Sequence, residues 1–455
     1  MISEEIAHAD APRIIRTYLL IAGLYTLSAS LIWGVNTLFL LEAGLDIYEV
    51  FIANAAFTAG MVIFEIPTGV IADTRGRRLS FLLSAVTLMV GTLAYVSISA
   101  IGGGLLPFVF ASIFMGLGFC FYSGAVEAWL VDGLNAAGYD GQLDQVFAKG
   151  SMVSGAAMLI GTVGGGVLGN ADLAWPFIGR AVLLAVVFLV ALRSMRDTGF
   201  TPHAATLSEM PVAMKRVLRS SITYGWKRRS VRLLMIVSFV QGGFMMWGFY
   251  AWQPYFLELL DRDAVWVAGV VAALIALSTI AGNGLVTFFT RFCGRRTTLL
   301  MWSAAGLAVA TIGVGLASSF WVAVILLLAS TTAVGVSEPV KQAYLHQVIP
   351  SEERATVVSF DSLVESAGGI GGQIGLGYLA RVQSIATGYV TGGVALFATL
   401  PVLIVLRFLR EPADSIVGRR AGQPAPCAAQ GLPEVSTVDT TPRQPVSSVA
   451  GENSA

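Results

Sequence analysis

Residues 69–101 read GVIADTRGRRLSFLLSAVTLMVGTLAYVSISAI. The stretch contains a basic turn, Arg75-Gly76-Arg77-Arg78, which is followed by residues 79–101 without a single charged side chain. About 20 consecutive apolar residues suffice for a helix to cross the hydrocarbon core of a bilayer, and basic residues collect at the cytoplasmic ends of such helices. We therefore predict a transmembrane helix that begins on the cytoplasmic side, directly after the basic turn.

The composition of the whole chain agrees with this local reading. Of its 455 residues, 55% are hydrophobic and only 12% are charged, whereas soluble proteins carry about 25% charged residues. The 28 basic and 28 acidic side chains cancel, which argues against a nucleic-acid-binding surface. Three cysteines that lie far apart do not form a disulfide framework. The composition indicates a multi-pass membrane protein in contact with the lipid bilayer.

Twelve stretches of the chain are long and apolar enough to be membrane spans. In lipid each backbone polar group needs an internal partner, so the spans are predicted to be helices and the fold class to be all-α. The expected ranges are 15–41, 48–72, 79–101, 104–132, 146–168, 174–193, 232–260, 264–290, 297–317, 320–348, 354–381 and 386–409.

The distribution of Lys and Arg predicts the orientation. Most of them fall in the N-terminal segment, in the loops that follow even-numbered spans, and in the tail. By the positive-inside rule both termini are then cytoplasmic, and the protein lies in the plasma (inner) membrane.

The two halves of the chain resemble each other. The turn Gly76-Arg77-Arg78 recurs as Gly294-Arg295-Arg296. Spaced glycines, which allow close helix packing, occur in the fifth and the eleventh span; they are Gly161, Gly165 and Gly169, and Gly368 and Gly372. Repeats of this kind are typical of transporters, with the substrate site between the two halves. The predicted domains are a cytoplasmic segment at 1–14, two pseudo-symmetric six-helix bundles at 15–193 and 232–409, a central loop with a basic amphipathic helix at 194–231, and a disordered cytoplasmic tail at 410–455.

The turn between the second and third spans resembles a known family motif. Residues 69–78 read Gly-Val-Ile-Ala-Asp-Thr-Arg-Gly-Arg-Arg, which is similar to the loop signature of bacterial transporters of the major facilitator superfamily. The resemblance extends over residues 15–409. It implies alternating access and an inner gate at which Asp73 and Arg77 act as a latch. The motif comprises Gly69, Asp73, Arg75, Gly76, Arg77 and Arg78. From the residues alone, these charges could equally serve only to fix the topology.

Two further features bear on the inner gate and on the kind of transport. Glu65 lies near the inner end of the second span, and we expect it to contact a basic loop at the gate. Residues 161–166 resemble in part the antiporter signature of drug exporters in the same superfamily, with Thr162 at the place of a proline. The fourth span lacks the arginine that drug-proton antiporters carry. Close packing of this glycine-rich helix is the alternative interpretation.

Five ionisable residues inside the spans are candidates for proton coupling. Such residues are costly in lipid and commonly mark proton or substrate pathways. Glu127 and Lys341 occupy corresponding places in the fourth and tenth spans, and the resemblance to the superfamily implies that these two spans line the central cavity. We therefore expect the two side chains to face each other across it, as a proton carrier or as a static pair. Glu338 is three residues from Lys341 and offers a local partner instead. Asp361 and Glu365, four residues apart, form a second proton-site candidate, or they line a solvated vestibule.

The seventh span and part of the first are candidates for the substrate cavity. Aromatic and Met side chains make an adaptable apolar surface that also attracts cations, which favours an amphiphilic substrate. Packing and lipid contact are the alternative role for these side chains. Arg180 in the sixth span is expected to reach outward to the membrane surface. The predicted cavity residues are Tyr25, Trp33, Asn36, Gln241, Met245, Trp247, Tyr250 and Trp252.

The sequence also narrows the class of function. A phosphate-binding loop needs Gly before Lys, but the four lysines follow Ala148, Met214, Trp226 and Val340. We therefore expect no nucleotide, no enzyme activity and no cofactor, and no His/Cys cluster has the spacing of a metal site. The predicted function is secondary transport of a small molecule by a monomer, with proton-coupled efflux of a drug-like compound favoured. The alternatives are proton-coupled import of a nutrient, and a membrane receptor or scaffold that transports nothing.

Overall fold

The computed structural model describes residues 2–200, 225–261, 264–350 and 353–416. Within these ranges the chain is helical apart from turns, short connections and one isolated bridge between Arg295 and Ser415. The all-α fold class is therefore confirmed. Most of the predicted amphipathic helix in the central loop, and the tail from residue 417 onward, lie outside the described residues.

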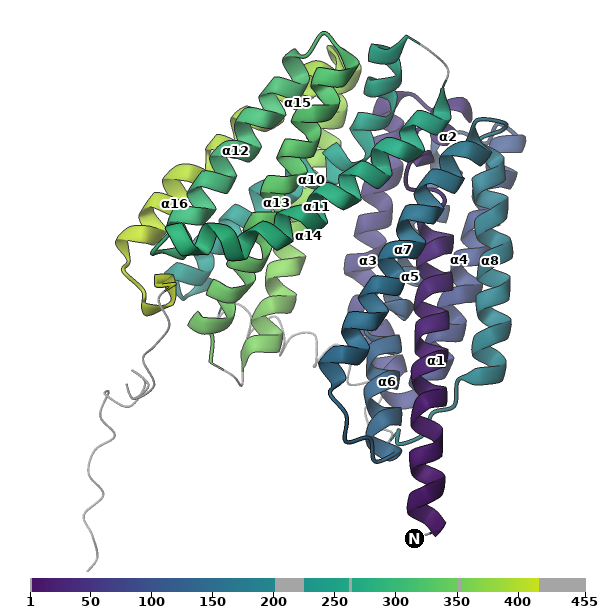
Figure 1. The fold of residues 1–455 in the computed structure, drawn as a ribbon. Coiled ribbons are helices and arrows are strands. Elements are labelled where there is room, and N and C mark those ends of the chain that lie inside the picture. Colours follow the sequence, from purple (N-terminus) through teal and green to yellow (C-terminus); the bar gives the residue numbers. More distant parts are fainter. Residues whose placement is uncertain (1, 201–224, 262–263, 351–352, 417–455) are drawn as a thin grey trace, which may run out of the picture. The chain divides into compact units, whose positions relative to one another are not determined.

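The first half of the chain contains eight helices in the order expected for six spans (Figure 1). Aspartate and glutamate at the start of α3 form a capping box, in which Asp46 accepts hydrogen bonds from the backbone and Glu49 reaches back to the backbone of Asp46. The helices are α1 (Ile2–Ser30), α2 (Asn36–Glu42), α3 (Ile47–Arg75), α4 (Arg77–Ala100), α5 (Leu105–Tyr122), α6 (Ala125–Ala136), α7 (Leu143–Gly169) and α8 (Ala174–Ser194).

The second half repeats the pattern. Its helices are α10 (Arg229–Leu260), α11 (Val265–Phe292), α12 (Arg296–Leu316), α13 (Phe320–Val348), α14 (Arg354–Val382), α15 (Ile385–Phe397) and α16 (Thr399–Phe408), followed by the short 3₁₀ helix η4 (Pro412–Asp414). Helices thus occupy all twelve ranges in which spans were predicted.

Three of the predicted spans are interrupted. The first breaks between α1 and α2 at residues 31–35, the fourth between α5 and α6 at Ser123 and Gly124, and the twelfth between α15 and α16 at Ala398. Gly124 has φ of +73°, a left-handed conformation that glycine adopts without the usual steric cost. The breaks leave backbone groups that need partners outside their own helix.

Ten helices in the described residues are long and apolar enough to cross a membrane, with α5 and α6, and α15 and α16, each taken as one. The first and the eleventh predicted spans are helical but are not among these ten helices. The first is divided by the break after Ser30, and α14 carries Asp361 and Glu365 among many glycines.

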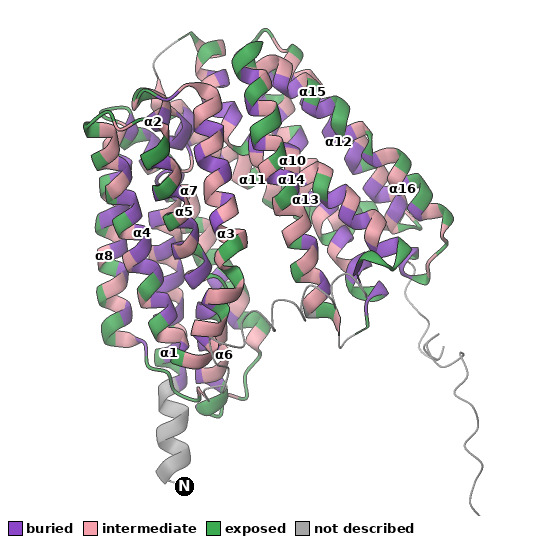
Figure 2. Ribbon diagram, turned by 180° about the vertical axis from the view of Figure 1, so that it is seen from behind, coloured by how far each residue is buried: buried purple, intermediate pink, exposed green. Residues whose placement is uncertain are grey.

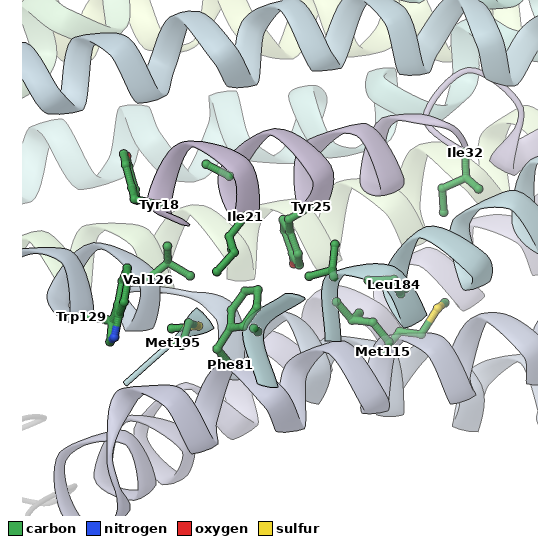
Figure 3. Close-up of a cluster of buried hydrophobic side chains, with 14 of the residues drawn as sticks. Tyr18, Ile21, Tyr25, Ile32, Phe81, Met115, Val126, Trp129, Leu184 and Met195 are labelled. Carbon is green, nitrogen blue, oxygen red and sulfur yellow. The ribbon is translucent and has the colours of Figure 1, made fainter. Parts of the chain in front are cut away.

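The interior of each half is a packed apolar cluster. In the first half, Figure 3 shows Tyr18, Ile21 and Tyr25 of α1 close to Phe81 of α4 and Val126 of α6. Large apolar side chains are also exposed, and Figure 2 shows exposed positions along the long helices among buried ones. Burial of one face and exposure of apolar side chains on the other suit a helix in lipid, where the outward face needs no polar groups.

The predicted packing glycines stand at close helix contacts. A Cβ atom on Gly161 would collide with Ser30 at the end of α1, and one on Gly165 would collide with the carbonyl oxygen of Leu31, the residue directly after α1. In the second half, a Cβ on Gly368 or Gly372 would collide with the backbone of α10. Glycine at these positions lets α1 and α7, and α10 and α14, approach backbone to backbone.

The chain remains structured past the predicted end of the last span. Residues 410–416 were assigned to a disordered tail, but Asp414 is buried and accepts hydrogen bonds from the backbone N–H (2.7 Å) and the hydroxyl (3.0 Å) of Thr297. Arg296 donates to the carbonyl oxygens of Ala413 and Ser415. The assignment of residues 410–416 was therefore wrong, because a carboxylate at the start of α12 ties this segment to the bundle.

Candidate functional site

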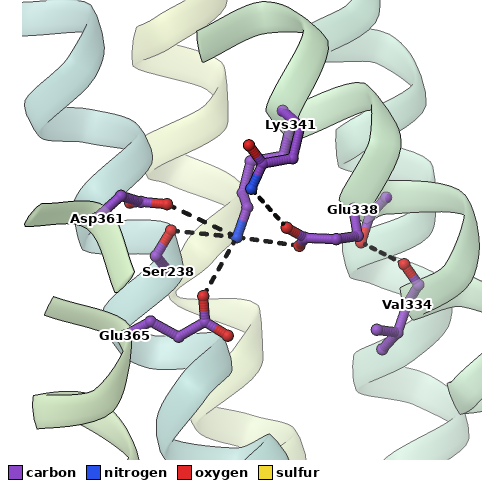
Figure 4. Close-up of polar contacts among 8 residues, drawn as sticks. Ser238, Val334, Glu338, Lys341, Asp361 and Glu365 are labelled. Atoms are coloured by element: carbon purple, nitrogen blue, oxygen red, sulfur yellow. Dashed lines mark hydrogen bonds and ion pairs between the residues drawn. The ribbon is translucent and has the colours of Figure 1, made fainter. Parts of the chain in front are cut away.

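Three carboxyl side chains of the second half lie around Lys341 (Figure 4). The Lys341 ammonium lies 3.0 Å from Glu338, 3.6 Å from Glu365 and 4.0 Å from Asp361, and it is 3.4 Å from the hydroxyl of Ser238. Glu338 and Lys341 belong to α13, the other two carboxyl groups to α14, and Ser238 to α10. We call Glu338, Lys341, Asp361 and Glu365 the Lys341 cluster.

Local sequence and helix packing together build this cluster. Glu338 and Lys341 are three residues apart and Asp361 and Glu365 four, so each pair lies on one face of its helix. The contact of α10 with α14 depends on glycine, since a Cβ on Gly242 would collide with the carbonyl oxygen of Glu365. Close packing thus brings the acidic face of α14 within reach of the lysine.

The cluster contains more acid than base. Three carboxyl groups share one ammonium group, so full ionisation would leave two negative charges uncompensated inside a membrane span. Lys341 and Asp361 are buried, and the Oδ1 atom of Asp361 has no hydrogen-bond partner among the described residues. Glu338 and Glu365 keep 46% and 37% of their side chains exposed. Such an arrangement can hold a proton, because protonation of one carboxyl removes an expensive buried charge.

Glu127 does not join the cluster. It lies in the first turn of α6, is exposed, and forms no ion pair with any described residue. All the ion-pair partners that the described residues provide for Lys341 come from the second half. The predicted contact between Glu127 and Lys341 is therefore not found in this conformation, whereas the local partner Glu338 is.

The basic turn after α3 is held by contacts within the first half. Asp73 and Arg77 form an ion pair of 2.6 Å, and the Nε atom of Arg77 lies 4.0 Å from Asp132 of α6. The turn thereby connects the ends of α3, α4 and α6.

Asp197, which the sequence analysis did not single out, anchors the same turn. Its carboxylate accepts a hydrogen bond of 2.9 Å from the backbone N–H of Arg78, and the Arg78 guanidinium donates to the carbonyl oxygen of Leu192 at 2.7 Å. Gly76 has φ of +103°, and a Cβ atom there would collide with the Asp197 carboxylate. No local pattern marks Asp197, because the residue meets the turn only through the fold.

Glu65 is exposed on α3 and forms no ion pair with a described basic residue, so the expected contact to a basic loop is not found in this conformation.

Contacts between the two halves gather at one end of the molecule, the end that carries α2. The side chain of Gln253 is fully buried and fills the break between α1 and α2. Its Nε2 donates to the carbonyl oxygen of Trp33 (2.8 Å), and its Oε1 accepts from the backbone N–H of Thr37 (2.9 Å). The Thr37 hydroxyl donates in turn to the carbonyl oxygen of Tyr250 (2.9 Å). Gln253 of the second half therefore replaces the hydrogen bonds that the first half loses at its helix break.

Helices α3 and α14 run antiparallel and meet at the same end. Asp46 pairs with Arg381 at 3.3 Å, and a Cβ on Gly377 would press against the ring of Phe51. One further contact lies deeper, where Gln373 donates to the hydroxyl of Thr58 at 3.3 Å. Beyond that pair the described residues of α3 and α14 form no hydrogen bond or ion pair with each other.

The register of these contacts can be continued toward the other end. Glu65 follows Thr58 by seven residues and lies on the same face of α3, and Ser366 precedes Gln373 by seven residues on the same face of α14. If the two helices approached along their whole length, Glu65 would therefore meet Ser366.

The predicted cavity residues divide into two groups. Tyr25, Asn36, Trp247 and Trp252 are buried, and Trp247 packs against Phe51, Phe244 and Tyr389. Trp33, Gln241, Met245 and Tyr250 are half-buried. The tryptophans of the seventh span thus belong to the packed core in this conformation, and only the second group has surface left for a ligand.

Arg180 does not lie at the membrane surface, where the sequence analysis predicted it. The residue was expected to reach the membrane surface, but it is 9% exposed and lies inside the first half. The snorkelling prediction was wrong because α8 turns this position toward α1 and α4 rather than toward lipid, with Phe177 one turn earlier packed on Phe39 and Tyr95.

Comparison with known proteins identifies the family to which this architecture belongs. A model of the Major Facilitator Superfamily matches residues 18–292 and 265–439. An uncharacterized MFS-type transporter, YxaM of Bacillus subtilis (strain 168), is 21% identical over 370 residues, which cover 81% of this chain and 89% of that protein. Among solved structures, the nucleoside transporter NupG has a TM-score of 0.70 at 12% identity, covering 87% of this chain and 98% of that one. A D-xylose-proton symporter has a TM-score of 0.61 at 18% identity and covers 86% and 96%. The fold and the family match together show that the chain belongs to the Major Facilitator Superfamily and is a multi-pass membrane transporter of a small solute.

Proposed function

We propose that protons drive this transporter and that the Lys341 cluster is the site that takes up and releases them. The observation that supports the proposal is the imbalance of three carboxyl groups around one ammonium group within 4.0 Å. Removal of one partner from a buried ion pair is costly. Protonation of one carboxyl group therefore changes which carboxylates pair with the Lys341 ammonium. Groups that interact this closely titrate as a unit rather than singly.

The proposed cycle assigns different tasks to the members of the cluster. Glu338 holds Lys341 at 3.0 Å and keeps the ammonium compensated. Asp361 and Glu365 lie farther from it and accept the transported proton between them. Loss of that proton strengthens the pull of α14 on Lys341, which biases the packing of α14 against α13. Since α14 also contacts α3 of the other half, its position bears on how the two halves meet.

The conformation supports alternating access in the predicted orientation. With both termini cytoplasmic, the α2 end faces outward, and the contacts of Gln253, Asp46 and Thr58 close the transporter on that side. Glu338 and Glu365 then have access to the cytoplasm through their exposed edges. This is one of the two end states that alternating access requires.

Export of a drug-like compound, the direction favoured by the sequence, was inferred from the aromatic side chains of the seventh span and from the resemblance of residues 161–166 to the antiporter signature. Trp247 and Trp252 are packed in the core, which removes one of the supports for a large apolar site. We therefore leave export and import as the two arms of one experiment. Proteoliposomes with an imposed pH gradient of either sign assign the direction. Proton-coupled import by symport loads the lumen with solute when the outside is acidic. Proton-coupled export by antiport loads the lumen when the lumen is acidic.

The proton site is tested with the double variant Asp361→Asn and Glu365→Gln. We expect the variant to keep solute exchange between equal pH compartments and to lose accumulation driven by a pH gradient. Glu127→Gln is the matched control, because it removes a carboxyl from the membrane without touching the cluster, and it should keep coupling. The proposal fails if the double variant accumulates solute like the wild type, or if Glu127→Gln alone abolishes coupling.

A further inference from the structure

We infer that Arg180 recognises the negative charge of the substrate, so that the transported solute is a small organic anion bearing a carboxylate or phosphate group. The inference deepens the proposed function by naming the substrate class. It concerns the first half of the chain and does not depend on which residues carry the proton.

Arg180 is a buried cation that has no anionic partner among the residues that the structure describes. It lies in α8, in a stretch whose other side chains are uncharged from Ala174 to Leu192. Among the described residues no carboxylate lies within 4.0 Å of its guanidinium, and its Nε atom is buried without a hydrogen-bond partner. This differs from Lys341, which has three carboxyl groups around it.

An arginine in this state needs a partner that the described protein does not supply. A charged side chain inside a membrane span is costly, because lipid cannot solvate it. Lysine can lower that cost by releasing its proton, but the guanidinium stays protonated in proteins. The planar fork of donors matches the two oxygens of a carboxylate or phosphate. A bound anion would therefore both compensate the charge and satisfy the free donor.

The surroundings of Arg180 favour an anion over a cation. The side chains of Tyr25, Tyr95 and Tyr250 are close enough to act on its charge, and they come from α1, α4 and α10. Phenol groups can donate hydrogen bonds to an anion without competing for the guanidinium as a carboxylate would. The Tyr95 hydroxyl is already engaged with the Ser112 hydroxyl at 2.5 Å, and the Tyr25 hydroxyl has Ser84 as a neighbour, which leaves Tyr250 as the available phenol.

Tyr250 links this position to the opposite half. It belongs to the second half, is half-buried, and its carbonyl oxygen accepts a hydrogen bond from Thr37 beside the helix break. A substrate held by Arg180 and Tyr250 would touch both halves, which is what a solute must do to be passed between them.

The test uses the full-length purified protein in nanodiscs made of phosphatidylcholine alone. Thermal unfolding is followed with benzoate, pyruvate and glycerol 3-phosphate as anionic probes, and with choline and glucose as cationic and neutral ones. A ligand that binds only the folded state raises the unfolding temperature in proportion to its affinity. We expect at least one anion, and neither choline nor glucose, to stabilise the wild type.

Three variants separate recognition from other effects. Arg180→Gln should weaken the affinity for the anion at least tenfold. Arg180→Lys should weaken it less, because the positive charge is kept while the planar set of guanidinium donors is lost. Arg193→Gln, on the exposed end of the same helix, should leave the affinity unchanged. The inference is overturned if Arg180→Gln binds the anion like the wild type, or if choline stabilises the protein and the anions do not. If Arg180→Gln fails to fold, the comparison of Arg180→Lys with the wild type decides.

Two further arms identify the source of the anion and keep the two proposals apart. The measurement is repeated with phosphatidylglycerol in the nanodiscs. If that lipid stabilises the wild type but not Arg180→Lys, and the soluble anions have no effect, the partner is a lipid headgroup and the substrate assignment falls. The double variant of Asp361 and Glu365 should bind the anion normally. If the wild type binds the anion through Arg180 but shows no accumulation driven by a pH gradient, the proposed function is refuted and this inference stands.

Discussion

Replacement of Gln253 by leucine should open the molecule at the α2 end. The side chain is fully buried and makes two hydrogen bonds of 2.8 and 2.9 Å to backbone groups at the break between α1 and α2. Leucine has a similar volume, so loss of packing is small. The carbonyl of Trp33 and the N–H of Thr37 are left buried without partners, at a cost of about 1–3 kcal/mol each.

The cost falls on one conformation only. When the α2 end opens, water can reach both backbone groups, so the penalty applies to the closed state alone. A shift of about 3 kcal/mol corresponds to roughly a hundredfold change in the ratio of the two states. An open state populated at about 1% in the wild type would then rise to about half of the molecules.

Spin labels at Glu42 and Gln383, which are exposed at the α2 end of the two halves, report this change as a distance distribution from pulsed electron paramagnetic resonance. The wild type should show one short distance, and Gln253→Leu should add a longer one. Gln373→Leu provides the matched control. Gln373 is equally buried at the interface, but it makes a single hydrogen bond of 3.3 Å and its Oε1 atom already lacks a partner. Equal distributions for Gln253→Leu and Gln373→Leu would refute the reasoning.

Three other predictions follow from contacts described above. In a background without native cysteines, Glu65→Cys and Ser366→Cys should cross-link faster when Gln253→Leu is added, because opening of one end closes the other; a rate that does not change contradicts the register of α3 and α14. Gly269→Val should reduce transport and lengthen the same spin-label distance, since a Cβ there would lie 2.5 Å from a carbonyl oxygen of α7, whereas Gly284→Val on the same helix meets open space and should behave like wild type. Asp414→Ala should destabilise the second half by about 1.5–3 kcal/mol in chemical unfolding, the usual value of hydrogen bonds to a charged group; a loss below about 0.5 kcal/mol, the usual effect of a surface substitution, would show that the cap is dispensable.

Elements that depend on neighbouring residues could be predicted from the sequence. The apolar stretches located the helices, since length and hydropathy are local properties. The pairs Asp73 with Arg77 and Glu338 with Lys341 were accessible for the same reason, because residues three or four apart share a helix face. The acidic pair of α14 was likewise identified before its partner was known.

Contacts between distant helices could not be predicted in this way. Nothing near Gln253 indicates that it fills a break in another helix, and Asp197 meets the basic turn only because α8 ends beside it. The position of Arg180 was missed because hydropathy does not say which face of α8 is turned inward. Correspondence between the halves also misled for Glu127, since equivalent places in two repeats need not be in contact.

The acidity of α14 has a consequence for how the protein is made. Its two carboxylates each cost about 2.5–3.5 kcal/mol on insertion scales. The segment therefore gains little free energy when it moves by itself from the translocon into lipid. Lys341 is synthesised earlier, on α13, and can neutralise the incoming helix as it arrives. We expect the two segments to enter the lipid as a pair, so that the lysine at the centre of the proposed proton site also guides the insertion of its neighbour helix.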